Sequence, residues 1–261
     1  MILKDKIAVI YGAGGDIGGA VARAFAREGA KLFLSGRTLS KVEALAADIK
    51  GRGGVAEAAQ VDALDEHAVE KYVSAVAEKA GRIDISFTAI AVALPTKAPL
   101  VELSVEDFER PIAAYTRANF LTARGAARRM VARRSGVILT ITGTPGRMGF
   151  MNVGGSGPAY AAIVALTRSL SVELAPQGVR VVCLMPNAIP ETATIRENFA
   201  RYAKAVGITP AQFQAQVEST THLKRLTTLA ELANAAAFLA SDQASAMTGT
   251  VANLSGGGVV D

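Results

Sequence analysis

Short apolar runs alternate with longer amphipathic segments from the start of the chain. The apolar runs have the length and β-branched content of buried strands, and they cover residues 6–12, 31–36, 55–62, 82–91, 136–143 and 178–187. The segments between them carry apolar residues at helical spacing, and they cover residues 17–30, 40–54, 66–81, 104–136 and 155–176. Because helices separate successive strands, the strands must run parallel through βαβ units. The pattern therefore predicts an α/β fold, with a doubly wound parallel sheet covered by helices on both faces.

Residues 188–222 interrupt this alternation. They follow the strand expected at 178–187, and open α/β sheets bind their ligands beyond the carboxyl ends of their strands. The helical stretches in this insertion predict a lid over a substrate pocket; a contact between subunits is the alternative. We expect a single domain over residues 1–261, with the lid as an insertion in it.

The composition limits the location and the kinds of partner that we expect for the protein. The chain is half hydrophobic and contains one cysteine, Cys183, so no disulfide can form within it and a reducing, cytoplasmic location is expected. The net charge is +5, and the basic run at 124–134 spreads around a helix, as in a solvated or subunit-facing helix. No nucleic-acid motif accompanies this charge, and no apolar stretch is long enough to span a membrane, so neither partner is expected.

The segment YGAGGDIGGAVARAFAREGA (11–30) has the features of a dinucleotide-binding loop. It follows a strand, opens a helix and begins a βαβ unit, the context in which such a glycine loop is informative. Gly12 permits a tight turn, Gly18 lets the helix pack closely, and the helix N-terminus attracts a pyrophosphate. Asp16 stands at the helix start, where an aspartate is usually an N-cap, although its charge would repel a pyrophosphate.

The chain resembles the short-chain dehydrogenase/reductase family over essentially its full length. The segments that carry the resemblance are the glycine loop, RIDI (82–85), APQGVRVVCLMP (175–186) and LKRLTTLAELANAAAFLASDQASAMTGTVANLSGGG (223–258). The resemblance implies a Rossmann-like sheet of about seven strands. It also implies a homodimer or homotetramer that transfers hydride between NAD(P) and a small carbonyl, alcohol or enoyl substrate.

The resemblance further identifies residues that would hold the cofactor. They are Gly12, Gly14, Gly15, Asp16, Ile17, Gly18, Arg37, Asp62, Ala63, Ala89, Tyr160, Pro186 and Ile189. Enzymes that prefer NAD usually carry an acidic residue at the end of the second strand, but here Gly36 and Arg37 stand there. A guanidinium suits a 2′-phosphate, so we expect NADP(H) to be preferred and NAD(H) to be possible. An exposed arginine in a turn is the alternative.

The catalytic positions depart from the family pattern. Counting from GVILTIT and from TRSLSVEL places the family's serine, tyrosine and lysine at Gly143, Ser156 and Tyr160, while Asn119 fills the asparagine position. Aligning Tyr160 with the catalytic tyrosine instead would put Val164 in the lysine position and require compensating gaps.

Tyr160 lies one helical turn beyond Ser156, so its phenol could enter the space that the lysine vacates. Without a neighbouring cation, it is expected to be a poor general acid. We therefore consider two hypotheses: an oxidoreductase with a non-standard proton donor, and a catalytically inactive dinucleotide-binding pseudoenzyme that acts through oligomer assembly. No cluster with metal-ligand spacing is present, so no metal is expected.

Overall fold

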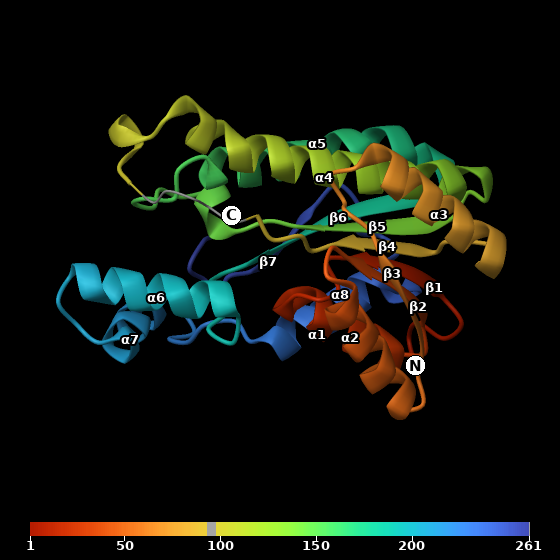
Figure 1. Ribbon diagram of the computed structural model, residues 1–261, viewed down its shortest axis with the longest axis horizontal. Coiled ribbons are helices and arrows are strands. Elements are labelled where there is room, and N and C mark those ends of the chain that lie inside the picture. The colour runs from red at the N-terminus through yellow and green to blue at the C-terminus, as the bar shows by residue number, and fades with distance from the viewer. Residues whose placement is uncertain (93–97, 261) are drawn as a thin grey trace.

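The computed structural model describes residues 1–92 and 98–260 and contains a seven-stranded parallel sheet (Figure 1). The strands are β1 (Ile7–Tyr11), β2 (Lys31–Gly36), β3 (Val55–Gln60), β4 (Ile85–Thr88), β5 (Gly136–Ile141), β6 (Val179–Pro186) and β7 (Val251–Leu254). Their order is β3-β2-β1-β4-β5-β6-β7, so the direction of winding reverses between β1 and β4. The predicted doubly wound sheet is confirmed.

Helices cover both faces of the sheet. They are α1 (Asp16–Arg27), α2 (Leu39–Gly51), α3 (Glu66–Ala80), α4 (Val105–Ala132), α5 (Ser156–Leu174), α6 (Ala193–Ala205), α7 (Pro210–Thr220) and α8 (Leu229–Ala240). Figure 1 shows α1, α2 and α8 on one face and α3, α4 and α5 on the other. All five helices expected before residue 178 are present, with boundaries close to those predicted.

Strand β1 shows how the sequence forms this core. Ala8 and Ile10 pack with the helices of one face, while Val9 and Tyr11 pack with those of the other. Successive side chains of a strand point to opposite faces, and both faces are covered, so every residue of β1 is buried. This explains why the strand appears in the sequence as an unbroken apolar run.

Two buried pairs of hydroxyls fasten the long helices to the sheet. Thr88, at the end of β4, contacts Thr122 of α4 at 2.8 Å, and Thr140 of β5 contacts Thr167 of α5 at 2.9 Å. Because buried polar groups need hydrogen-bond partners, each pair fixes where its helix lies along the strand. The first turns of both helices thereby extend beyond the carboxyl ends of β4 and β5.

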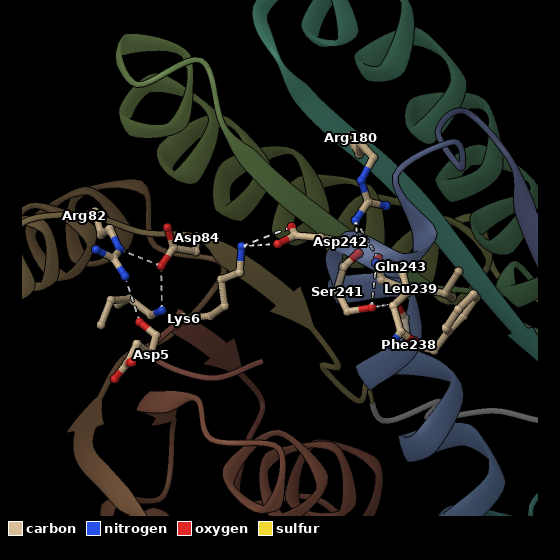
Figure 2. Close-up of polar contacts among 11 residues, drawn as sticks. Asp5, Lys6, Arg82, Asp84, Arg180, Phe238, Leu239, Ser241, Asp242 and Gln243 are labelled. Carbon is tan, nitrogen blue, oxygen red and sulfur yellow. Dashed lines mark hydrogen bonds and ion pairs between the residues drawn. The ribbon is translucent and has the colours of Figure 1, made fainter. Parts of the chain in front are cut away.

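The amino edge of the sheet is held by ionic and backbone contacts (Figure 2). Lys6 pairs with Asp242 at 3.1 Å, and Arg82 pairs with Asp84 at 2.8 Å. Arg180 donates to two carbonyls at the end of α8, both at 2.9 Å. Lys6 and Arg180 thus join the beginnings of β1 and β6 to the end of α8, and the Arg82–Asp84 pair lies at the start of β4.

Helices α6 and α7 lie within the insertion predicted at 188–222. The ring of Phe213 in α7 lies 5.5 Å from that of Phe199 and 5.7 Å from that of Tyr202, both in α6. Figure 1 shows the pair standing apart from the layered body, on the side where α4 and α5 begin. Its role as a lid stays a prediction. Among the described residues, no helix is both long and apolar enough to cross a membrane.

Candidate functional site

The loops that follow β1 and β4 touch at the point where the winding of the sheet reverses. Gly12 has a φ of +75°, a conformation that favours glycine, and a Cβ on it would lie 2.3 Å from the carbonyl oxygen of Ala89. Only a residue without a side chain allows this approach. Crevices at such a reversal are where open α/β sheets bind ligands. The tight turn predicted at Gly12 is therefore confirmed, and Ala89 lies against it.

The glycine loop also holds the N-terminus of α1 against the turn. A Cβ on Gly18 would lie 2.3 Å from the carbonyl oxygen of Gly12, so the close packing predicted at Gly18 is confirmed. Gly15 is the N-cap residue of α1, and no side chain caps this end of the helix. Gly14 and Gly15 are exposed. The arrangement presents an uncapped helix N-terminus beside the crevice, which is a site for an anion.

Asp16 does not cap α1, contrary to the expectation from its position. It is the first residue of α1, and its carboxylate accepts a hydrogen bond from the backbone N–H of Ala193 at 2.7 Å. Ala193 is the first residue of α6, whose N-cap, Thr192, also accepts from the N–H of Ile195 at 3.4 Å. Asp16 thus joins the glycine loop to the predicted lid across 177 residues of chain.

We expect Asp16→Ala to loosen the start of α6, because a lost helix cap costs about 1 kcal/mol. Hydrogen exchange at Ala193 should become about fivefold faster, in line with that free energy. Asp16→Asn keeps an oxygen acceptor and should change the exchange rate far less. Amide exchange read by NMR measures both. Equal exchange in the wild type and Asp16→Ala would show that this contact does not restrain α6.

Two cations stand beside the glycine loop at the end of β2. Arg37 and Lys41 are both exposed, and a Cβ on Gly14 would lie 3.1 Å from the Cβ of Lys41. The first turn of α2 carries no acidic residue, and no carboxylate pairs with either cation among the described residues. Lys41 was missed in the sequence, although it lies in the first turn of α2, four residues after Arg37.

The remaining predicted cofactor residues follow the carboxyl ends of β3 and β6. Asp62 Oδ1 accepts from the N–H of Leu64 at 3.0 Å, which orders the turn after β3, and the neighbouring Ala63 is buried. Pro186 ends β6, and the carbonyl of the buried Ile189 accepts from the Thr192 hydroxyl at 2.8 Å. The fold therefore brings all the predicted cofactor residues to one edge of the sheet.

Tyr160 occupies the space beside Gly143. A Cβ on Gly143 would lie 3.1 Å from Tyr160 Cε2, so the tyrosine ring and a serine at position 143 would compete for the same volume. Ser156 is the first residue of α5 and is buried one turn before Tyr160. Burial, with a smaller contribution from Tyr115, raises the pKa of Tyr160 well above its usual range. This shift strengthens the expectation that Tyr160 is a poor general acid.

Asn119 is buried in α4, and its side-chain amide donates to the Tyr115 carbonyl at 2.9 Å. The other amide atom, Oδ1, has no partner among the described residues. The Tyr115 ring lies 5.5 Å from the Tyr160 ring, with the ring planes tilted at 55°. Tyr115 was missed in the sequence, although it precedes Asn119 by one helical turn and therefore shares its face.

Comparison with known proteins agrees with this geometry. A family model described as enoyl-(acyl carrier protein) reductase matches residues 12–258. The uncharacterized oxidoreductase YxbG of Bacillus subtilis is 31% identical over 98% of this chain and 91% of that protein. The chain belongs to the short-chain dehydrogenase/reductase family. Membership in this family of oxidoreductases accounts for the glycine loop, the sheet order and the C-terminal segment together.

Solved structures of the short-chain dehydrogenase/reductase fold superpose on almost all of the chain. Sorbitol-6-phosphate 2-dehydrogenase SrlD from Erwinia amylovora has a TM-score of 0.91 and 30% identity, covering 97% of this chain and 100% of that one. An NAD+-bound xylitol dehydrogenase also has a TM-score of 0.91, with 27% identity, and covers 98% of this chain and 100% of that one. Among the described residues, no group of three or more potential ligands is arranged to hold a metal ion.

Proposed function

We propose that the protein is an NADP(H)-dependent oxidoreductase that interconverts a small carbonyl compound and its alcohol, or reduces an enoyl compound. The main support is the close backbone packing at the point where the strand order reverses, which we call the backbone cradle. Cβ atoms at Gly12 and Gly18 would each lie 2.3 Å from a backbone oxygen. Such close backbone packing, next to an uncapped helix N-terminus, fits a pyrophosphate. A similar protein, xylitol dehydrogenase, is known with NAD+ bound.

Different residues around the cradle would bind different parts of the dinucleotide. The N-terminus of α1 would hold the pyrophosphate, Asp62 would accept hydrogen bonds from the adenine end, and Arg37 and Lys41 would pair with a 2′-phosphate. When bound, the nicotinamide supplies or accepts the hydride. Asp16 weakens this site less than its charge suggests, because its carboxylate faces the N-terminus of α6.

Apolar side chains around the predicted entrance favour an uncharged substrate. Met148, Phe150 and Met151 follow β5 and are exposed by 43%, 45% and 80%. The Tyr202 hydroxyl of α6 donates to the Met151 carbonyl at 3.1 Å, so this loop and the predicted lid meet. A substrate passing between them would contact mainly carbon atoms. Small neutral ketones, diketones and enals are therefore the compounds to screen first.

Arg37→Ala should weaken NADPH binding about 10- to 100-fold while changing NADH binding less than about threefold. The reason is that a hydrogen bond to a charged group contributes about 1.5–3 kcal/mol, and only NADPH carries the 2′-phosphate. Lys41→Ala should act in the same direction with a smaller loss, because a lysine makes no bidentate contact. Isothermal titration calorimetry of the wild type and both variants with each dinucleotide measures these affinities.

Arg133→Ala is the matched control, since Arg133 is exposed at the far end of α4 and its loss changes the net charge equally. It should leave both affinities unchanged at physiological salt. Equal losses of NADPH and NADH in Arg37→Ala would contradict the 2′-phosphate assignment. Failure of the wild type to bind either dinucleotide would contradict the proposed function itself.

The position of Tyr160 supports a second candidate, an inactive dinucleotide-binding protein. Its ring stands against Gly143, where the family carries a serine, and burial raises the pKa of its hydroxyl. A pseudoenzyme would bind NADPH without oxidising it in the presence of diacetyl, hexenal and related carbonyl compounds. An oxidoreductase would consume NADPH with at least one of them, so a single screen separates the two candidates.

A further inference from the structure

Tyr115 connects the segments that follow β4 and β5. It is half-buried in α4, and its hydroxyl oxygen accepts a hydrogen bond from the backbone N–H of Val92, after β4, at 3.4 Å. On the other side its ring contacts that of Tyr160, whose own ring lies against Gly143, after β5. The Tyr115 hydroxyl is thus held where the carboxyl ends of β4 and β5 meet the crevice.

We propose that Tyr115 is the proton donor of this protein and that Tyr160 is a positioning residue whose ring packs against that of Tyr115. The proposal rests on the proposed oxidoreductase function and adds a residue to it. Three observations carry it: the Val92 N–H directed at the Tyr115 oxygen, the packing of the two rings, and the filling of the lysine position by Tyr160.

The two tyrosines are not equivalent in this arrangement. Burial, with a smaller contribution from the neighbouring Tyr115, raises the pKa of Tyr160. Tyr160 therefore keeps its proton, and its ring packs against that of Tyr115. The Tyr115 oxygen receives a hydrogen bond from the backbone N–H of Val92 at 3.4 Å, so this donor points at the atom that would carry negative charge after proton transfer. Tyr115 is consequently the member of the pair that can give its own proton to a substrate.

The chemical step balances with these groups. The substrate carbonyl carbon gains a hydride, that is, one hydrogen with two electrons, which the reduced nicotinamide supplies. The carbonyl oxygen gains the Tyr115 proton, so the C=O double bond becomes an alcohol. The Tyr115 oxygen then recovers a proton from solvent. Asn119 lies one turn away, and its unpartnered Oδ1 offers an acceptor for the water that would deliver this proton.

The packing of the two rings is measurable without any substrate, because the chain contains only five tyrosines. We expect 13C NMR of tyrosine Cζ atoms, assigned through single Tyr→Phe variants, to show Tyr160 ionising well above the usual pH range of a tyrosine, since burial raises its pKa. Tyr160→Leu should shift the Tyr115 resonance, because it removes the ring that packs against Tyr115. Ionisation of Tyr160 in the usual range, or an unchanged Tyr115 resonance in Tyr160→Leu, would overturn the positioning role of Tyr160 whether or not the protein turns over a substrate.

Turnover provides the second measurement, with NADPH and diacetyl as the probe pair. Tyr115→Phe should lower kcat about 10²- to 10⁴-fold with little change in KM, as expected for a lost general acid. Tyr160→Leu should lower kcat about tenfold, since it removes the ring that packs against Tyr115 and so displaces the donor. Tyr72→Phe is the control, because Tyr72 is a half-buried tyrosine of α3 outside the site and its hydroxyl has no partner among the described residues.

The outcomes separate the proposal from the function on which it rests. An active wild type whose kcat is unaffected by Tyr115→Phe would overturn the role of Tyr115 alone. A wild type that binds NADPH but reduces neither diacetyl nor hexenal would overturn the proposed oxidoreductase, and with it the role of Tyr115 as donor. Because Tyr115→Phe removes one oxygen atom from a half-buried side chain, loss of folding is not expected, and circular dichroism verifies this.

Discussion

The triple substitution Gly143→Ser, Ser156→Tyr and Tyr160→Lys is expected to raise kcat by about 10²- to 10⁴-fold, the usual contribution of an aligned general acid. It restores all three residues that the short-chain dehydrogenase/reductase pattern places at these positions. The introduced lysine would favour the ionised form of the introduced tyrosine and bring its pKa toward neutrality. The rate of NADPH oxidation with diacetyl, measured at saturating concentrations of both, gives the result.

The structure explains why all three substitutions are needed together. A serine at position 143 would place its Cβ 3.1 Å from the Tyr160 ring, so Gly143→Ser alone should destabilise the protein by about 1–3 kcal/mol. In the Tyr160→Lys background the ring is absent, and the same change should cost much less. A double-mutant cycle on thermal unfolding measures this coupling. Additive losses would contradict the contact between Gly143 and Tyr160.

Tyr115→Phe connects this result to the proposed donor. In the triple variant the introduced tyrosine supplies the proton, so Tyr115→Phe should no longer lower kcat by a large factor. If the triple variant folds and binds NADPH but gains no activity, the assignment of positions 143, 156 and 160 to the family's catalytic residues is wrong. Unchanged sensitivity to Tyr115→Phe in an activated triple variant would show that Tyr115 acts on the substrate in both proteins.

Features set by local backbone rules were predictable from the sequence. The turn at Gly12 and the close packing at Gly18 depend on residues a few positions apart, and both are present as expected. The central strands were predictable because they are largely buried on both faces and therefore appear as short apolar runs, whereas the edge strands β3 and β7 are more exposed. The order of the strands, with its reversal between β1 and β4, was not predicted, because it depends on which distant segments pair.

Features that depend on contacts between distant segments were not predictable. Asp16 was expected to cap its own helix, but it caps α6, which begins 177 residues later. No local pattern in the glycine loop indicates this partner. Tyr115 was overlooked for a different reason, since its one-turn spacing from Asn119 was visible but only the packing of α4 against α5 brings it to Tyr160. The candidate donor, Tyr115, is therefore identified by its contact with Tyr160 in the folded protein and not by the sequence spacing alone.

Gly18→Ala should disable the proposed cofactor site, whereas the neighbouring Gly19→Ala should leave it intact. Both glycines are buried in α1, and each substitution gains about 1 kcal/mol of helix propensity. They differ in what the new methyl group meets. At Gly18 it would lie 2.3 Å from the Gly12 carbonyl oxygen, which is backbone, while at Gly19 it would lie 3.3 Å from the tip of the long Arg23 side chain.

We therefore expect Gly18→Ala to force α1 away from the Gly12 turn. The new methyl group would clash with the Gly12 carbonyl oxygen, and this backbone atom can move away only if the whole loop moves. Displacing a binding element by about 1 Å can cost 10²-fold, so NADPH affinity should fall by about that factor. The free energy of unfolding should fall by about 1–3 kcal/mol, which lowers Tm by about 2–4 °C per kcal/mol for a domain of this size. Calorimetric titration and thermal unfolding of the two variants measure these effects. Equal NADPH affinity in Gly18→Ala and Gly19→Ala would mean that the dinucleotide does not rest on the Gly12–Gly18 contact.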